Sequence, residues 1–479
     1  MNYAIILYTL GWVLNIEACC MLLPLICGIC YSDWSNVKVF ALCIAICLVT
    51  GLTLINTRPK NKTMYSHEGF TTVALSWIVI SLFGALPFVI SGSIPNYIDA
   101  LFETVSGFTT TGASILTDVE VMPKALLFWR SFTHWIGGMG VLVFLIAILP
   151  LSGGSNLFLI KAESPGPSVS KLVPKVKSTA KILYLIYLGL TAFEIILLLL
   201  GDMPLFDALT LSFGTAGTGG FGIKNSSIGD YSPYLQNVIT VFMILFGIDF
   251  SLYYLILTKR ARDAFKSEEY KTYLGIIAIS TTIIILNTLG TFSGLAEALR
   301  HSSFQVASII TTTGYSTVDF NAWPSLSKTV LILLMFIGAC AGSTGGGIKV
   351  SRILILLKSI RKEIKLVAHP RVTHRITMNG RPVEHETVRS VNVYMAVYFM
   401  VFALSLLIIS FDNFNFETNF TTVTTAINNI GPIFSQIDPV ANLSYYSPLS
   451  KLVLIADMLI GRLEMFPMLI LLSPLNWKK

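Results

Sequence analysis

Four short stretches of threonine and glycine are the residues in this chain best suited to bind an ion. They read Thr109-Thr-Thr-Gly112-Ala-Ser114, Ala216-Gly-Thr-Gly-Gly220-Phe-Gly222, Thr311-Thr-Thr-Gly314-Tyr-Ser316 and Asn428-Asn-Ile-Gly431-Pro432. Their aligned glycines are separated by 108, 94 and 117 residues. The carbonyl oxygens of extended backbone can replace the water shell of a bare cation, and glycine leaves them free to face a common axis.

We therefore predict four strands around one pore, with backbone oxygens that select the ion. The predicted selectivity filter comprises Thr110, Thr111, Gly112, Gly219, Gly220, Thr312, Thr313, Gly314, Asn429, Ile430 and Gly431. Its ion-coordinating part comprises Thr111, Gly112, Gly219, Gly220, Thr313, Gly314, Ile430 and Gly431. Close packing between helices is the alternative use of such small residues, but it does not explain their common register.

Each Thr/Gly stretch follows an apolar segment that is too short to cross a membrane. These segments cover about 96–107, 205–215, 296–309 and 415–427, and each has a helix-start residue or an acidic first turn. Non-helical backbone at membrane depth is tolerated only where it is buried in protein or lines a water-filled cavity. We expect four half-helices that aim their partly negative C-terminal ends at a central cavity, which favours a cation.

The elements that hold these segments must be membrane helices. The chain has 479 residues, of which 54% are hydrophobic and 12% charged, with a mean hydropathy of +0.72. Soluble domains carry roughly 25% charged residues. This composition excludes a cytosolic enzyme, a nucleic-acid binder and a secreted disulfide scaffold. With no recognisable nucleophile–base pair or metal cluster, we expect neither catalytic residues nor a cofactor.

Ten apolar stretches are long enough to span a bilayer, at about 20 residues each. They lie at roughly 4–30, 37–56, 69–91, 126–150, 180–200, 233–257, 272–292, 326–357, 391–410 and 448–472. We predict an all-α polytopic membrane protein with two extra N-terminal transmembrane helices and four pseudo-equivalent helix–pore loop–helix units. The N-terminal pair occupies 1–67, and the units occupy 68–158, 159–258, 259–370 and 371–479.

The basic residues predict the orientation of these helices. Of the 33 Lys and Arg, 23 fall in alternate connections and at the C-terminus, whereas the opposite connections hold six, together with thirteen Asp and Glu. By the positive-inside rule the basic connections are cytoplasmic, which places both termini inside. An acidic outer face also concentrates cations at an external mouth. The basic inner face attracts anionic lipid.

A glycine-rich stretch interrupts the span at 326–357. Residues 338–347 contain five glycines: Gly338, Gly342, Gly345, Gly346 and Gly347. Because glycine costs about 1 kcal/mol per helix position relative to alanine, this stretch is unsuited to a helix. A break there puts a flexible loop across the conduction path. It is not a nucleotide-binding loop, because isoleucine follows the last glycine and no strand precedes the stretch.

Three charged or polar residues lie within or next to the predicted spans, and each has a small number of possible roles. Arg462 lies inside the last span and either pairs with Asp457 or Glu464 or projects below the filter as an electrostatic barrier. Lys349, at the end of the glycine-rich stretch, is a second cation near the path or the start of the cytoplasmic basic stretch. His134 has no metal-binding neighbour at ligand spacing, so we interpret it as a packed, hydrogen-bonded histidine.

With these motifs in view, the chain resembles the Trk-type potassium uptake subunits of bacteria, within the superfamily that includes the Ktr, fungal Trk and plant HKT transporters. The resemblance covers essentially the whole chain, and the two extra N-terminal spans favour the Trk branch over Ktr. Besides the four filter stretches, the matching segments are Arg130-Ser-Phe-Thr-His-Trp-Ile-Gly-Gly-Met-Gly140, Gly338-Ala-Cys-Ala-Gly-Ser-Thr-Gly-Gly-Gly-Ile-Lys349 and Met378-Asn-Gly-Arg-Pro-Val383.

The resemblance implies a homodimer in the bacterial inner membrane, with a cytosolic nucleotide-binding regulatory subunit of NAD or ATP type docked beneath it. It implies K⁺ as the transported ion, bound at the ion-coordinating residues given above. It also implies that the glycine-rich loop, Lys349 and Arg462 form the gate. In this superfamily, serine at the first filter glycine accompanies sodium permeability, so Gly112 implies a preference for K⁺ and Rb⁺.

Two positions depart from the family pattern. Lys224 sets a cation near the outer mouth where Gly222-Ile-Lys replaces a Ser-Thr-His run, and Ile433 replaces a glycine. A sodium-permeable or ion-coupled cation symporter of the same superfamily remains the alternative function. An alternating-access transporter is disfavoured because the four units repeat without inversion.

Overall fold

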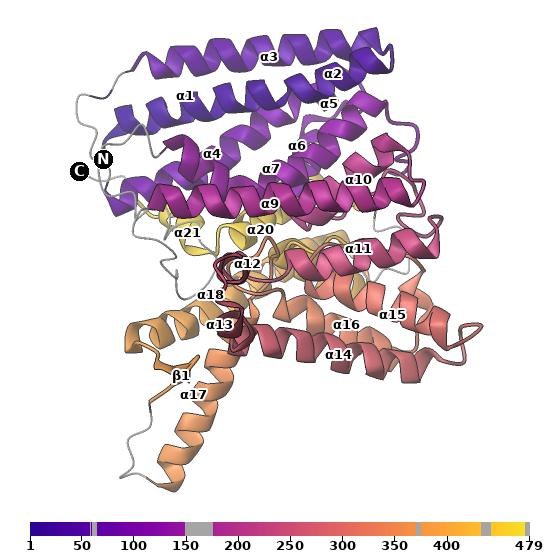
Figure 1. Ribbon diagram of the computed structural model, residues 1–479. Coiled ribbons are helices and arrows are strands. Elements are labelled where there is room, and N and C mark those ends of the chain that lie inside the picture. The colour runs from indigo at the N-terminus through magenta and orange to yellow at the C-terminus, as the bar shows by residue number, and fades with distance from the viewer. Residues whose placement is uncertain (58, 60–64, 149–175, 370–374, 433–441, 475–479) are drawn as a thin grey trace.

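The computed structural model describes residues 1–57, 59, 65–148, 176–369, 375–432 and 442–474, and its regular structure is mostly helical (Figure 1). The first part of the chain forms α1 (Tyr3–Cys20), α2 (Leu22–Cys30), α3 (Trp34–Ile55), α4 (Ser66–Gly84), α5 (Leu86–Ile90), α6 (Tyr97–Phe108), α7 (Lys124–Ile148), α9 (Val176–Leu200), α10 (Leu205–Gly217), α11 (Pro233–Phe246) and α12 (Phe250–Leu257). The second part forms α13 (Ala261–Phe265), α14 (Glu268–Thr288), α15 (Leu295–Ile310), η1 (Phe320–Ala322), α16 (Ser325–Ile337), α17 (Val350–Ala368), α18 (His385–Ile409), η2 (Ser410–Asp412), α19 (Phe416–Asn428), α20 (Pro448–Arg462) and α21 (Phe466–Leu472). One antiparallel ribbon joins β1 (Thr377–Met378) to β2 (Arg381–Pro382). The predicted all-α fold is confirmed.

Several helices are long and apolar enough to cross a membrane. Six candidates are present within the described residues: Tyr3–Cys30, Trp34–Ile55, His67–Ile90, Lys181–Leu200, Glu268–Thr288 and His385–Asp412. Helices α11 and α12 make a seventh candidate that is bent by 91°. The chain is therefore a multi-pass membrane protein.

Three of the ten predicted spans are interrupted rather than continuous. The span at 233–257 breaks where Asp249 caps α12 by accepting a hydrogen bond from the Ser251 N–H (2.8 Å). The span at 326–357 breaks at its glycines. The last span breaks after Arg462, where Glu464 and Met465 have positive φ values of 56° and 70°. Averaged hydropathy cannot detect such breaks, because the residues on both sides stay apolar.

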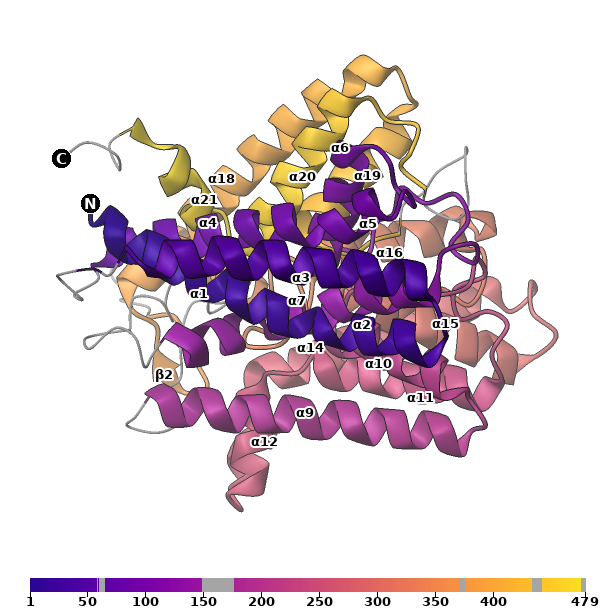
Figure 2. The same cartoon turned by 90° about the horizontal axis from the view of Figure 1, so that it is seen from above.

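The N-terminal helices pack against the body of the protein through an aromatic cluster. Helices α1 and α3 lie side by side along one edge (Figures 1 and 2). Trp129 of α7 contacts Phe40 of α3 and Phe108 of α6 edge to face, with ring centroids 6.4 and 6.0 Å apart. Its indole N–H donates to the Gly84 carbonyl (3.0 Å), so this buried ring is fully satisfied.

The four predicted half-helices are present, with ends within two residues of those expected. They are α6, α10, α15 and α19. Asn96 caps α6 through its side chain and the Ile98 N–H (2.8 Å), and Asn415 caps α19 through the Thr418 N–H (2.9 Å). These caps satisfy amide groups that a helix start leaves without partners, which is why the polar start signals located the helices well.

Candidate functional site

The four short helices end in the same backbone turn. In each, one N–H bonds to the carbonyl three residues earlier (3.0–3.4 Å) and the next N–H bonds to the carbonyl five residues earlier (2.8–3.1 Å). The first of these two residues has a left-handed φ of 55–58°: Thr110, Thr218, Thr312 and Asn429. This is the Schellman pattern of a helix end, which usually has glycine at that position. Threonine in this conformation is strained, and such strain is typical of functional sites.

The aligned glycines follow two residues later and close a ring, which we call the filter ring (110–112, 218–220, 312–314 and 429–431). All four have positive φ values, between 76° and 94°. A Cβ atom built on each would fall against a carbonyl oxygen of the next segment: Gly112 on Gly219 (1.9 Å), Gly220 on Thr313 (1.9 Å), Gly314 on Ile430 (2.2 Å) and Gly431 on Thr111 (2.8 Å). Glycine is therefore required at each position both by the backbone conformation and by the close approach of the neighbouring segment.

A side-chain hydroxyl braces three of the four segments. Six residues before the ring glycine, Ser106, Ser308 and Thr425 donate to the carbonyl seven residues ahead, at 2.5, 2.5 and 2.6 Å. The second segment has Gly214 at the corresponding position. There the Tyr315 hydroxyl lies 2.1 Å from where a Cβ would be, and it donates to the Leu211 carbonyl (3.0 Å).

The His134 ring also supports the second segment, which lacks the bracing hydroxyl of the other three. A Cβ on Gly219 would collide with its ring at 2.2 Å. The two ring nitrogens lie 2.8 Å from the Gly107 carbonyl oxygen and 3.3 Å from the Phe221 backbone nitrogen. This geometry fits a neutral ring that donates to the carbonyl and accepts from the N–H. The interpretation of His134 as a packed, hydrogen-bonded histidine is confirmed.

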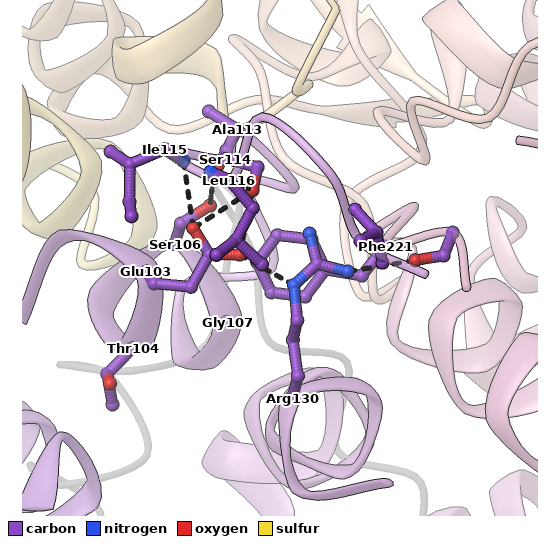
Figure 3. A network of polar contacts seen from close by, with 12 residues as sticks. Glu103, Thr104, Ser106, Gly107, Ala113, Ser114, Ile115, Leu116, Arg130 and Phe221 are labelled. Atoms are coloured by element: carbon purple, nitrogen blue, oxygen red, sulfur yellow. Dashed lines mark hydrogen bonds and ion pairs between the residues drawn. The ribbon is translucent and has the colours of Figure 1, made fainter. Parts of the chain in front are cut away.

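A buried ion pair joins the first and second segments and was missed in the sequence (Figure 3). Arg130 Nε lies 2.6 Å from Glu103 Oε1, with the two side chains 3% and 1% exposed. Glu103 also accepts from the Ser114 hydroxyl (2.9 Å) and the Ile115 N–H (3.0 Å), and Arg130 Nη1 donates to the Gly222 carbonyl (2.9 Å). Burial of both charges is tolerated because each has several partners.

The only sequence signal for Glu103 was an acidic residue inside an otherwise apolar half-helix. The guanidinium of Arg130 lies over the Phe221 ring at 3.5 Å from its centroid, directly after the second filter glycine. Figure 3 shows the pair on two helices, with Glu103 reaching the extended segment at Ser114 and Ile115 that follows the first filter turn. The pair therefore fixes the two segments relative to one another.

The glycine-rich segment 338–349, which we call the gate loop, connects α16 to α17. The predicted break is present, since α16 ends at Ile337 and α17 begins at Val350. Gly338, Gly342 and Gly347 have φ values of 74–76°. A Cβ on Gly338 would lie 2.5 Å from the Gly346 carbonyl oxygen, so the two ends of the loop pack on each other.

The gate loop lies directly against the filter ring. The Gly346 N–H donates to the Thr312 hydroxyl (2.6 Å), and the Gly347 N–H donates to the Asn428 carbonyl (3.1 Å). A Cβ on Gly345 would lie 2.5 Å from the Ala339 Cβ and 2.9 Å from the Thr311 carbonyl oxygen. The loop thus contacts the third and fourth segments on the side of their helix ends.

Arg462 joins the gate loop to the first segment. Its Nη1 donates to the Thr344 carbonyl (2.9 Å) and the Thr110 hydroxyl (3.2 Å), and its Nη2 donates to the Gly137 carbonyl of α7 (2.7 Å). Its two predicted ion-pair partners bind elsewhere: Glu464 pairs with Arg352, and Asp457 accepts from a serine hydroxyl. Of the two alternatives for Arg462, the structure has the projection towards the filter.

Comparison with known proteins shows the family to which the chain belongs. The TrkH family, described as a cation transport protein, matches residues 35–479. The chain belongs to the TrkH family. It is 35% identical to the Trk system potassium uptake protein TrkH of Salmonella typhimurium, with both chains fully covered. It is 31% identical to TrkG of Escherichia coli over 99% of this chain and 98% of that protein.

A solved TrkH structure has the same fold. The crystal structure of the potassium transporter TrkH from Vibrio parahaemolyticus superposes with a TM-score of 0.89 and 32% identity, covering all of both chains. The predicted resemblance is therefore confirmed. Since these TrkH family relatives are named as transport proteins, the expectation that the chain is a transporter rather than an enzyme is confirmed too.

Lys349 and Lys224 are further predicted residues that the structure of this TrkH family member describes. Lys349 is 3% exposed, and its ammonium group donates to the Gly345 carbonyl, so it folds back on the gate loop instead of extending the basic stretch. The Lys224 ammonium lies 4.3 Å from the centroid of the Tyr231 ring. Ile433 is outside the described residues. Within the described part of the chain, no group of three or more His, Cys, Asp or Glu side chains could hold a metal ion.

Proposed function

We propose that this protein carries K⁺ into the bacterial cell across the inner membrane, through the filter ring. The observation that supports this most directly is the closed succession of glycine-to-carbonyl approaches around the four segments. Full-length relatives named as potassium uptake proteins support the choice of ion. The four units 68–158, 159–258, 259–370 and 371–479 each supply one segment, and residues 1–67 add two helices beside the first unit.

Backbone oxygens of the ring select the ion. They belong to Thr111, Gly112, Gly219, Gly220, Thr313, Gly314, Ile430 and Gly431. The strained turns before the glycines hold these oxygens without a helical hydrogen-bonding partner of their own, so they can replace water around a dehydrated cation. The short helices end at the ring, and their partly negative ends favour a cation there. The arrangement favours K⁺ and its analogue Rb⁺.

The gate loop and Arg462 close the path below the ring. The loop contacts two segments and Arg462 contacts a third, so a cation leaving the ring meets both a physical barrier and a fixed positive charge. Lys349 adds a second positive charge while its ammonium stays on the Gly345 carbonyl. Opening requires that the loop and Arg462 move together.

A cytosolic nucleotide-binding subunit of NAD or ATP type controls this gate, and the membrane subunit is a homodimer with both termini in the cytoplasm. The basic connections at 258–271 and 358–389 carry thirteen Lys and Arg on the cytoplasmic face. They suit an acidic protein surface as well as anionic lipid.

Rubidium-86 uptake into proteoliposomes tests the proposal. Wild-type protein should take up the ion rapidly, with K⁺ but hardly Na⁺ as a competitor, and Gly314→Ser should weaken that discrimination. Equal competition by Na⁺ in the wild type would favour the sodium-permeable alternative. Dependence of uptake on a proton or sodium gradient would favour a coupled symporter. Discrimination that Gly314→Ser leaves unchanged would overturn the assignment of selectivity to the ring.

A further inference from the structure

The segment Thr377–Val383 forms a hairpin that the proposed conduction path does not use. It comprises β1, β2 and a tight turn in which Asn379 and Gly380 both have positive φ values (51° and 75°). An Asn-Gly pair with two such residues is the turn that best matches the twist of a hairpin. The hairpin lies beside α17, which projects from the body of the protein (Figure 1).

Glu268, the first residue of α14, holds this hairpin. Its N–H donates to the Asn379 side-chain oxygen (2.7 Å), and its own carboxylate accepts from the Asn379 N–H (2.9 Å). Lys358 of α17 completes the contact, since its ammonium pairs with Glu268 and donates to the Thr377 carbonyl (2.7 Å). The hairpin, α17 and the start of α14 are therefore joined at one carboxylate.

The next residue, Glu269, holds the two ends of the gate loop. The same oxygen, Oε1, accepts from the Ala341 N–H (2.7 Å) near the start of the loop and from the Ser351 N–H (3.1 Å) in the first turn of α17. Hydrogen bonds to a carboxylate are about twice as strong as those between neutral groups. One carboxylate thus closes the loop at its base.

We propose that Glu268 and Glu269 are paired positioning residues that transmit a displacement of the hairpin to the gate loop. The inference rests on the proposed role of the loop as gate. The two residues are adjacent on one helix, so a movement that shifts Glu268 also shifts Glu269 and loosens its hold on Ala341 and Ser351. A regulatory protein that draws the hairpin away from α14 would open the loop by this route.

Chemical reactivity of Cys340 reports the state of the loop without any need for ion flux. Cys340 lies in the gate loop and is 1% exposed. In a protein whose other six cysteines are replaced by alanine, a methanethiosulfonate reagent should modify Cys340 slowly while the loop is closed. The test compares this rate in Glu269→Gln, which weakens the hold on the loop, and Asn379→Gly, which removes the side-chain oxygen that accepts from the Glu268 N–H but tolerates the positive φ.

Both substitutions should raise the modification rate by about tenfold, the change that about 1.4 kcal/mol produces. Lys358→Met should act in the same direction and Lys358→Arg should restore the wild-type rate, whereas a merely disordered protein would not be rescued. Glu363→Gln, on an exposed position of α17, is the matched control and should leave the rate unchanged.

If Asn379→Gly and Lys358→Met leave the Cys340 rate at the wild-type value, the hairpin does not act on the loop and the inference is wrong, whatever Glu269→Gln does. Rubidium-86 uptake is measured on the same proteoliposomes. Absence of uptake by the wild type would count against the proposed function, while the thiol rates would still decide whether hairpin and loop are coupled.

Discussion

The filter ring and the gate loop are both glycine-rich, non-helical backbone between helices, but they are held in opposite ways. In the ring, three of the four segments are braced by a hydroxyl close in the sequence, as when Ser106 and Ser308 donate to carbonyls seven residues ahead. The gate loop is contacted by side chains much farther away in the sequence: Thr312, Glu269 and Arg462 lie 34, 72 and 118 residues from the loop atoms that they contact.

This difference indicates which of the two regions can move. The ring contacts are local and repeated, and each glycine is packed so closely that displacement of one segment collides with the next. The loop contacts depend on the positions of α14, α15 and α20, so a shift of any of these helices releases part of the loop. The proposed function requires a rigid selector beside a barrier that can be released, and this difference supports that proposal.

The largest expected effect comes from a methyl group in the ring. Gly112→Ala places a Cβ 1.9 Å from the Gly219 carbonyl at a φ of 80°, so K⁺-selective rubidium-86 uptake should fall on the order of 100-fold, equivalent to about 2.7 kcal/mol. Gly431→Ala, with 2.8 Å to the Thr111 carbonyl, should be milder. Equal losses in the two variants would mean that backbone conformation, and not the close approach, decides the requirement for glycine.

Arg462→Gln tests the proposed barrier at the gate loop. It removes the positive charge and at least one of the hydrogen bonds to the gate loop and α7. Uptake in the absence of any regulatory subunit should rise by about tenfold, while the preference for K⁺ over Na⁺ stays the same. Arg462→Lys keeps the positive charge, so its uptake rate should lie between those of the wild type and Arg462→Gln. Lost selectivity in Arg462→Gln would show that the ring depends on the gate.

Two serines allow a matched comparison. Ser308 donates to the Tyr315 carbonyl in the ring (2.5 Å), and Ser343 donates to the Cys340 carbonyl in the gate loop (2.6 Å). Each substitution to alanine should cost about 1 kcal/mol. Ser308→Ala should weaken discrimination against Na⁺ in competition assays, whereas Ser343→Ala should change only the uptake rate. The reverse pattern would contradict the division of roles.

The smallest effect is expected from a substitution in the connections that flank the ring. The Asn225 amide donates to the Asp118 carboxylate (2.9 Å), and this hydrogen bond lowers the pKa of that exposed carboxyl below its usual value of 3.8. The contact therefore stabilises the folded protein above that pH and is lost as the pH falls through the lowered pKa. Asn225→Ala should lower the melting temperature slightly at pH 7, by less than Ser308→Ala does. A larger drop would mean that the ring depends on support from its outer loops.

Sequence patterns predicted the helices around the ring closely because their signals are local. Asn96 caps α6 through atoms within two residues, and the Thr/Gly turns at the helix ends depend on a few adjacent positions. The glycine-rich break in the third unit was predicted for the same reason. The breaks at Asp249 and Glu464 were missed, since a single polar residue in an apolar span has no distinctive pattern.

Contacts between distant parts of the chain were beyond sequence patterns. Glu103 and Arg130 are 27 residues apart and become partners only when α6 packs on α7. Glu269 and Ser351 are 82 residues apart. The two alternatives for Arg462 remained open in the sequence because Asp457 and Glu464 both lie within five residues of it, and the choice depends on where Arg352 and Ser405 lie.

The sequence by itself determined that this is a multi-pass helical protein with four glycine-centred turns after four short helices, because hydropathy, caps and turn residues act over a few positions. Only the tertiary structure decided that each glycine faces a carbonyl of the next segment and that the loop and Arg462 lie beneath the ring. Those arrangements depend on packing between residues that lie from 34 to 352 positions apart, and no short stretch of sequence specifies which helix its neighbour will be.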